Sequence, residues 1–252
     1  MESRKIILAT AYENQGDFFK CYHAFENKQV ATPNEQNTSE QAIVIFDKDY
    51  PQNLKTSSHP PFALFYQGNK NLLKSARKHI GFVDDIDQED TEEGKYNREK
   101  ILTDLNTDYI CVLRHDLYKD NKTLVELKKL NRNEIILILA QGIDTNEESV
   151  KYVLEHNGLV VSICPSITTE PYENSLIASR ELLANLSDFI YVNEIKESGL
   201  ITVGCAMFSK RNIFIGTSPY SNFSALRKNN ELIKGGVEMI TCGLEIDTLL
   251  LQ

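Results

Sequence analysis

The chain of 252 residues carries a formal net charge of −9, with 41% hydrophobic and 25% charged residues. This length can bury one α/β core with a small appendage, and no apolar run approaches the roughly 20 residues of a membrane span. The acidic balance argues against strong non-specific binding to nucleic acid, because neutralising phosphates requires clustered Lys and Arg.

The N-terminal 30 residues predict two short helices, because apolar residues recur at helical spacing on both sides of a break at Gly16-Asp17. Residues 32–41 (TPNEQNTSEQ) are polar and predict a linker. We therefore expect a small helical N-terminal segment with its linker over residues 1–40, followed by a main domain over residues 41–252.

The first part of the main domain alternates predicted strands and helices. The run EIILILA at residues 134–140 is continuously apolar, which is typical of a strand buried on both faces of a parallel sheet. Thr145 and Glu148 fit a capping box for the helix that follows this strand. Further strands are expected at residues 42–46, 62–66, 80–83, 109–113 and 159–164, and further helices at residues 96–105 and 124–130.

The segment after the strand at residues 80–83 is strongly acidic. Seven carboxylates lie between Asp84 and Glu93. They alternate in the manner of a calcium loop, but Asp90 and Tyr96 stand where that loop needs glycine and glutamate. We interpret the segment as a solvated loop and expect no metal site. The five cysteines never form C-x-x-C, so we expect reduced thiols in a cytoplasmic protein.

The C-terminal part of the chain gives the clearest prediction. Two strands joined through a helix favour parallel pairing, with a ligand crevice at the carboxyl ends of the strands. A turn at Ser198-Gly199 would lie at that edge, where the N–H groups of the next helix form an anion seat. The predicted order is a helix ending near residue 187, a strand at 188–195, a polar turn at 196–199, a helix at 200–210, a strand at 212–217 and a further helix near 230–236.

Several of these segments resemble the DprA/Smf family of DNA-processing proteins. Residues 42–74 resemble the family pattern "D-x-x-Y-P-x-x-L … P-P-x-x-L-F-x-x-G-x-x-x-L-L". YVNEI (191–195), SGLIT (198–202) and NELIKGG (230–236) resemble the patterns "V-V-E-A", "S-G-(S/T)-L-I-T" and "N-x-L-I-x-x-G-A". The resemblance implies an α/β fold, a Rossmann-like parallel-sheet domain preceded by a small helical N-terminal segment.

The resemblance also implies a function without catalysis or a cofactor. The chain would bind single-stranded DNA and hand it to a RecA-type recombinase during DNA uptake or recombination, and it would form a homodimer. Backbone amides and positive side chains would grip the phosphates. The residues expected to carry this DNA binding are Arg180, Ser198, Gly199 and Thr202.

The loops that face DNA in the family are altered in this chain. The family's "G-S-R" loop reads Asp84-Asp85-Ile86, and both glycines of "S-G-x-A-x-G-I-D" are replaced within residues 113–120. One residue of the family pattern is also missing between Gly199 and Leu200. Two alternatives therefore stay open: an interaction or dimerisation protein that has lost DNA binding, and an enzyme acting on a nucleotide-derived small molecule, since a fold alone does not fix function.

Overall fold

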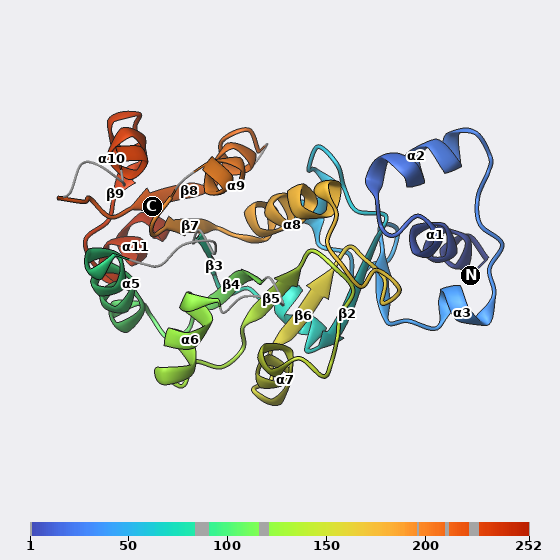
Figure 1. Ribbon diagram of the computed structural model, residues 1–252, viewed down its shortest axis with the longest axis horizontal. Coiled ribbons are helices and arrows are strands. Elements are labelled where there is room, and N and C mark those ends of the chain that lie inside the picture. Colours follow the sequence, from blue (N-terminus) through green and yellow to red (C-terminus); the bar gives the residue numbers. More distant parts are fainter. Residues whose placement is uncertain are drawn as a thin grey trace.

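This computed structural model describes residues 2–83, 91–115, 121–195, 197–209, 212–221 and 227–251 (Figure 1). The N-terminal helices gather at one end of an elongated molecule, and the C-terminus lies at the other end (Figure 1). Most of the predicted acidic loop and most of the altered second loop fall on residues 84–90 and 116–120, outside the described residues.

In the described part of the chain, strands β1 to β9 form one sheet in the order β1-β2-β6-β5-β4-β3-β7-β8-β9. Neighbouring strands from β6 to β9 pair in parallel, whereas β1 and β2 pair antiparallel with their neighbours. The prediction of a Rossmann-like parallel sheet is thus confirmed. The bounds are β1 Ala42–Val44, β2 Ala63–Gly68, β3 His79–Val83, β4 Ile110–His115, β5 Ile136–Leu139, β6 Leu159–Ser162, β7 Phe189–Val192, β8 Phe214–Thr217 and β9 Glu238–Met239.

Helices cover both faces of this sheet. The α8 and α9 helices pack on one face, while α5, α6, α7 and α11 pack on the other. The interior strand β5 has no exposed side chain, as its apolar run predicts, because both layers cover it. The bounds are α4 Gln52–Lys55, η1 Lys70–Lys74 (a 3₁₀ helix), α5 Glu92–Asp104, α6 Lys122–Lys129, α7 Glu148–Glu155, α8 Glu173–Leu186, α9 Glu197–Met207, α10 Arg227–Lys234 and α11 Gly243–Leu250.

The N-terminal segment has its own apolar core against β1 and β2. Helices α1 (Glu2–Glu13) and α2 (Phe18–Glu26) confirm the predicted pair, and Asp17 caps α2 by accepting a hydrogen bond from the Lys20 amide. Phe18 stacks on Phe62 at 5.5 Å between ring centroids. Asn174 donates to Asp17 at 2.9 Å, which ties this segment to α8.

Three local predictions were wrong in detail. The expected linker contains a one-turn helix, α3 (Glu35–Thr38), because Asn37 is buried and donates to Glu13 and Thr32. Helix α7 is capped by Glu147, whose carboxylate accepts from the Val150 amide at 2.9 Å, and not by the capping box expected at Thr145. The expected turn at residues 196–199 is largely helical, since α9 already begins at Glu197.

Candidate functional site

The sheet changes direction between β3 and β7. From β3 the chain builds outward through β4, β5 and β6, and it then returns to add β7, β8 and β9 on the other side of β3. Val83 and Val192, the last residues of β3 and β7, pair directly. Ligands of open parallel sheets bind at the carboxyl ends of the strands at such a reversal. The segment from Asn193 to the first turn of α9 stands at this edge.

Gly199 lies in the first turn of α9 and approaches the end of β3. A Cβ atom added at Gly199 would stand 2.7 Å from Ile195 Cγ1 and 3.3 Å from Val83 Cγ1. A larger residue here would force the Ile195 side chain to move, so glycine lets the helix start close to the sheet edge. The early helix start suits the sequence, because Glu and Ser are tolerated in a first helical turn, where a negative charge complements the dipole. The structure thus places Ser198 and Gly199 at the sheet reversal.

A buried polar network holds the chain between β7 and α9. Asn229, which has no exposed surface, donates to Thr217 Oγ1 at 2.7 Å and to the Asn193 carbonyl, and its Oδ1 accepts from the Ile195 amide at 3.1 Å. Tyr220 donates to the Asn193 carbonyl at 3.0 Å. Within the described residues the Asn193 Nδ2 group has no hydrogen-bond partner although Asn193 is 2% exposed. One buried side-chain donor at the carboxyl edge of the sheet is therefore left without a partner among the described residues.

The carboxylate of Glu194, in the same segment, accepts hydrogen bonds from Thr91, the residue that caps the N-terminus of α5. Both Glu194 oxygens accept from the Thr91 amide at 3.2 Å, and the Thr91 hydroxyl donates to Oε1. Glycine at position 94 makes this possible, since a Cβ there would stand 2.1 Å from Glu194 Oε1. Glu93 similarly accepts from the Ser221 amide at 3.0 Å. Carboxylates of the protein thus already occupy donors at this edge, and they make it less attractive to phosphate.

The other two predicted residues lie elsewhere on α8 and α9. Thr202 is 3% exposed, so a ligand could contact it only after α9 moved. Arg180 donates to the Leu176 carbonyl at 3.1 Å and lies within electrostatic reach of Cys205. Cys205 stands six residues beyond Gly199, which is about 9 Å along the helix axis. Of the four predicted residues, Ser198 and Gly199 therefore lie at the start of α9, whereas Arg180 lies beside its far half.

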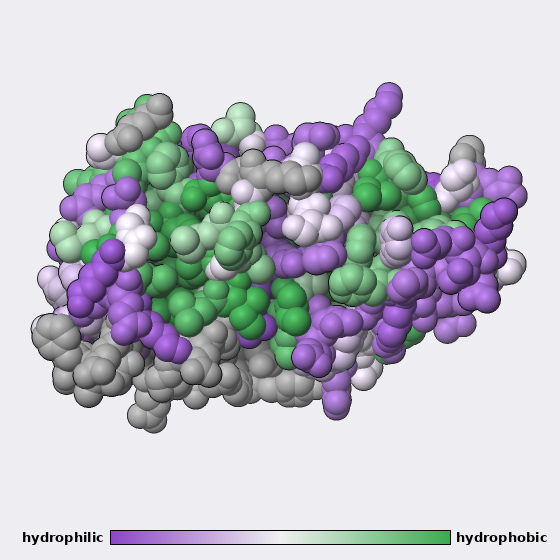
Figure 2. Space-filling view, turned by 90° about the horizontal axis from the view of Figure 1, so that it is seen from above, coloured by the Kyte–Doolittle hydropathy of each residue, from purple (hydrophilic) through white to green (hydrophobic). Residues whose placement is uncertain are grey.

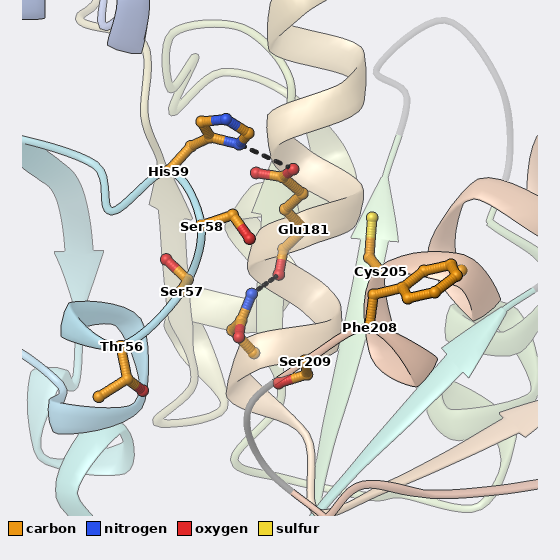
Figure 3. A pocket seen from close by; sticks show the side chains of 10 residues that line it. Thr56, Ser57, Ser58, His59, Glu181, Cys205, Phe208 and Ser209 are labelled. Carbon is orange, nitrogen blue, oxygen red and sulfur yellow. Dashed lines mark hydrogen bonds and ion pairs between the residues drawn. The ribbon is translucent and has the colours of Figure 1, made fainter.

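A cavity of about 340 Å³ opens beside this far half, between α8, α9 and the segment that follows α4 (Figure 3). His59 Nδ1 lies 3.2 Å from Glu181 Oε1 at its side. The second ring nitrogen points away from Ser58, so these groups do not form a Ser-His-Glu catalytic triad (Figure 3). Sequence reasoning missed this cavity, because its walls come from segments more than 100 residues apart. Its lining residues are Thr56, Ser57, Ser58, His59, Glu181, Asn185, Gly204, Cys205, Phe208 and Ser209.

Four of the five cysteines have the environment of unreactive thiols. Burial raises the pKa of Cys21, Cys111 and Cys164 to about 12, and burial with the nearby Glu181 raises the pKa of Cys205 to about 11. Nucleophilic thiols instead have lowered pKa values. Among the described residues, no group of three or more His, Cys, Asp or Glu side chains is placed to hold a metal ion, and no helix is long and apolar enough to cross a membrane.

Comparisons with known proteins agree on one relationship. A family model described as DNA recombination-mediator protein A matches residues 41–250. Over 211 residues the chain is 25% identical to DNA processing protein DprA of Streptococcus pneumoniae (strain ATCC BAA-255 / R6). The aligned region covers 80% of this chain and 71% of the relative.

Two solved structures have the same fold. The X-ray structure of DprA from Streptococcus pneumoniae matches with a TM-score of 0.71 at 19% identity, covering 91% of this chain and 81% of that one. The structure of DprA from Helicobacter pylori, described for its single-stranded DNA binding mode, matches with a TM-score of 0.67 at 17% identity, covering 84% and 96%.

Proposed function

The chain belongs to the DNA recombination-mediator protein A family, the DprA-like DNA-processing proteins, and on this basis we propose that it binds single-stranded DNA without catalysing a reaction. The observation that supports this proposal best is the placement of Ser198 and Gly199 at the sheet reversal. The first-turn amides of α9 would donate to phosphate. Arg180 would add a positive side chain further along the strand of DNA.

Binding to a labelled oligonucleotide tests this proposal directly. We expect the fluorescence anisotropy to rise at low salt and the affinity to fall at moderate salt, because each neutralised phosphate releases counterions. The salt dependence should be shallow, since the net charge is −9. Replacing Arg180 by alanine should weaken binding about fivefold, the effect of losing one phosphate contact.

Arg77→Ala is the matched control for Arg180→Ala. Arg77 pairs with Glu134 at 2.6 Å, next to the start of β3 and remote from the carboxyl ends of the strands. Its removal should leave the affinity unchanged. If no oligonucleotide binds even at low salt, the DNA-binding proposal is wrong, and the chain is then better described as an interaction protein of the same fold. The Glu194 and Glu93 carboxylates at the sheet edge favour that second reading.

We further propose a homodimer that engages a RecA-type recombinase in the cytoplasm, where both DNA and recombinase are found. Apolar side chains gather on the face over α8 and α9 (Figure 2). Exposed apolar patches of this kind mark protein interfaces. The exposed apolar side chains on these two helices include Ile177, Ile201 and Met207, which are 37%, 40% and 60% exposed.

Replacing Met207 by glutamate should disrupt self-association through this face. A carboxylate buried against a second apolar face without a partner is costly, so we expect the dimer dissociation constant to rise at least tenfold. Sedimentation velocity over a concentration series measures the change. Phe46→Glu is the control, because Phe46 is 79% exposed and follows β1, the strand at the opposite edge of the sheet from β9. Equal dissociation constants for the two variants would place the dimer contact elsewhere.

A further inference from the structure

The cavity beside the far half of α9 has the size and chemistry of a ligand site. Its volume of about 340 Å³ lies within the range of small-molecule pockets. It lies apart from the sheet reversal, because Gly204 and Cys205 line it from the second half of α9. Hydroxyl groups supply much of its wall. Thr56 and Ser57 donate their hydroxyl protons to the backbone, at 3.0 and 2.8 Å, so their oxygens remain as acceptors.

Glu181 supplies the strongest acceptor in the cavity. Its Oε1 atom faces His59 Nδ1, while Oε2 accepts no hydrogen bond from any described residue. The side chain of Glu181 is only 22% exposed, so its carboxylate is partly shielded from water. A ligand that offers an N–H group to Oε2 would replace lost water contacts with a charge-assisted hydrogen bond. The neighbouring Ser58 hydroxyl can either donate or accept.

Flat surfaces border the same cavity. The His59 ring is fixed by Glu181 and by Phe18, whose ring centroid is 5.2 Å away. Phe208, which is 88% exposed, lines the cavity from the end of α9, with its ring directed away from His59 and Glu181 (Figure 3). Exposed side chains change rotamer on the picosecond to nanosecond scale, so Phe208 can turn toward a planar ligand. Aromatic rings and histidines of this kind stack on nucleobases.

We propose that this cavity receives a nucleobase that carries an exocyclic amino group, as cytosine does. The amino group would donate to Glu181 Oε2, the base would stack between His59 and Phe208, and Ser58 would hydrogen-bond the adjacent ring nitrogen. Carboxylates recognise cytosine through its amino group in this way. Arg180, whose positive charge reaches Cys205 in the cavity wall, would attract the attached phosphate. The base comes from single-stranded DNA if the proposed function holds, and from a free nucleotide otherwise.

A tryptophan reporter makes the binding measurable without any activity assay. The chain contains no tryptophan, so Phe208→Trp introduces a single indole at the cavity mouth. We expect cytidine to quench its emission, and uridine to bind at least about fivefold more weakly, because uridine places a carbonyl oxygen where the amino group would meet the carboxylate. Equal affinity for the two nucleosides, or no response to either at millimolar concentration, would overturn the proposal.

A second variant tests the role of Glu181. In the reporter protein, Glu181→Gln should abolish the preference for cytidine, because the glutamine amide can also donate to the uridine carbonyl. Glu173→Gln, the same chemical change at the exposed start of α8, should retain it. A preference that survives Glu181→Gln would remove Glu181 from the site.

Homopolymeric oligonucleotides separate this inference from the proposed function. If oligo-dC and oligo-dT bind equally and the Phe208→Trp reporter does not respond to cytidine, the DNA-binding proposal is supported and the proposed base pocket is wrong. If cytidine binds to the reporter but no oligonucleotide binds, the pocket stands as a site for free nucleotides and the DNA-binding proposal falls. Preferential binding of oligo-dC with quenching of the reporter supports both.

Discussion

Replacing Gly16 by alanine is expected to lower the free energy of unfolding by about 2–5 kcal/mol, the sum of about 1–2 kcal/mol for a left-handed backbone and about 1–3 kcal/mol for a steric overlap. Gly16 has a φ of 76°, which L side chains rarely adopt. An added Cβ would also stand 1.8 Å from the Ile163 carbonyl oxygen at the end of β6. The turn between α1 and α2 would have to move away from the main sheet. Urea unfolding followed by circular dichroism measures the loss.

Residues of this turn form hydrogen bonds that connect the N-terminal segment to the main domain. Tyr172 donates to the Gln15 carbonyl at 3.0 Å, and Asn174 donates to Asp17 at 2.9 Å. Both bonds should lengthen or break in Gly16→Ala. If the segment unfolds separately, the variant will show a second, earlier transition, and if the chain folds as one unit, its single transition will move as a whole.

Gly236→Ala is the matched control for the steric part of this effect. Gly236 also has a positive φ, 97°, but no atom lies within 4 Å of its added Cβ. The free energy of unfolding of Gly236→Ala should fall only by the backbone contribution, about 1–2 kcal/mol. Equal losses at Gly16 and Gly236 would show that the contact with Ile163 contributes nothing to stability.

Replacing Asn229 by alanine is expected to lower the free energy of unfolding by about 3–4 kcal/mol, because buried polar groups lose their partners. The Ile195 amide would lose its acceptor, and the Thr217 hydroxyl and the Asn193 carbonyl would each lose a donor. Of these, the Asn193 carbonyl still accepts from Tyr220. The unsatisfied Ile195 amide should therefore dominate the loss.

The same substitution should loosen the segment that positions α9. Hydrogen exchange at the Ile195 amide should accelerate, and oligonucleotide affinity should fall with it if the sheet reversal binds DNA. Asn212→Ala is the control, because Asn212 is exposed beside β8 and its loss should change neither property. Unchanged exchange at Ile195 in Asn229→Ala would show that the network does not hold this segment.

The sequence predicted the order of strands and helices well, because buried strands and amphipathic helices carry periodic signals. The run at residues 134–140 identified β5, and the pattern from residue 188 identified β7, α9 and β8. Predictions failed where a single side-chain contact decides the local structure. Glu147 caps α7 in place of the expected box, and Asn37 folds part of the linker into α3. Local propensity does not reveal which of several polar residues will find a partner.

The candidate site was predictable only in part. A helix start after a strand can be read from sequence, so the position of Ser198 and Gly199 beside the carboxyl end of β7 was predictable. Arg180 was expected with them, yet it lies along the far half of α9 because the packing of α8 against α9 sets its position. The hydrogen bond between Thr91 and Glu194 joins residues 103 positions apart, and no sequence motif predicts it.

By itself the sequence determined the fold class, the family and the position of Ser198 and Gly199 at the carboxyl edge of the sheet, because hydrophobic period and short motifs are local properties of the chain. Only the tertiary structure decided which donors at that edge are already satisfied and where Arg180 lies. It alone formed the cavity between His59 and Phe208. These features depend on contacts between distant segments, and the free energy of such contacts exists only once the sheet has brought the segments together.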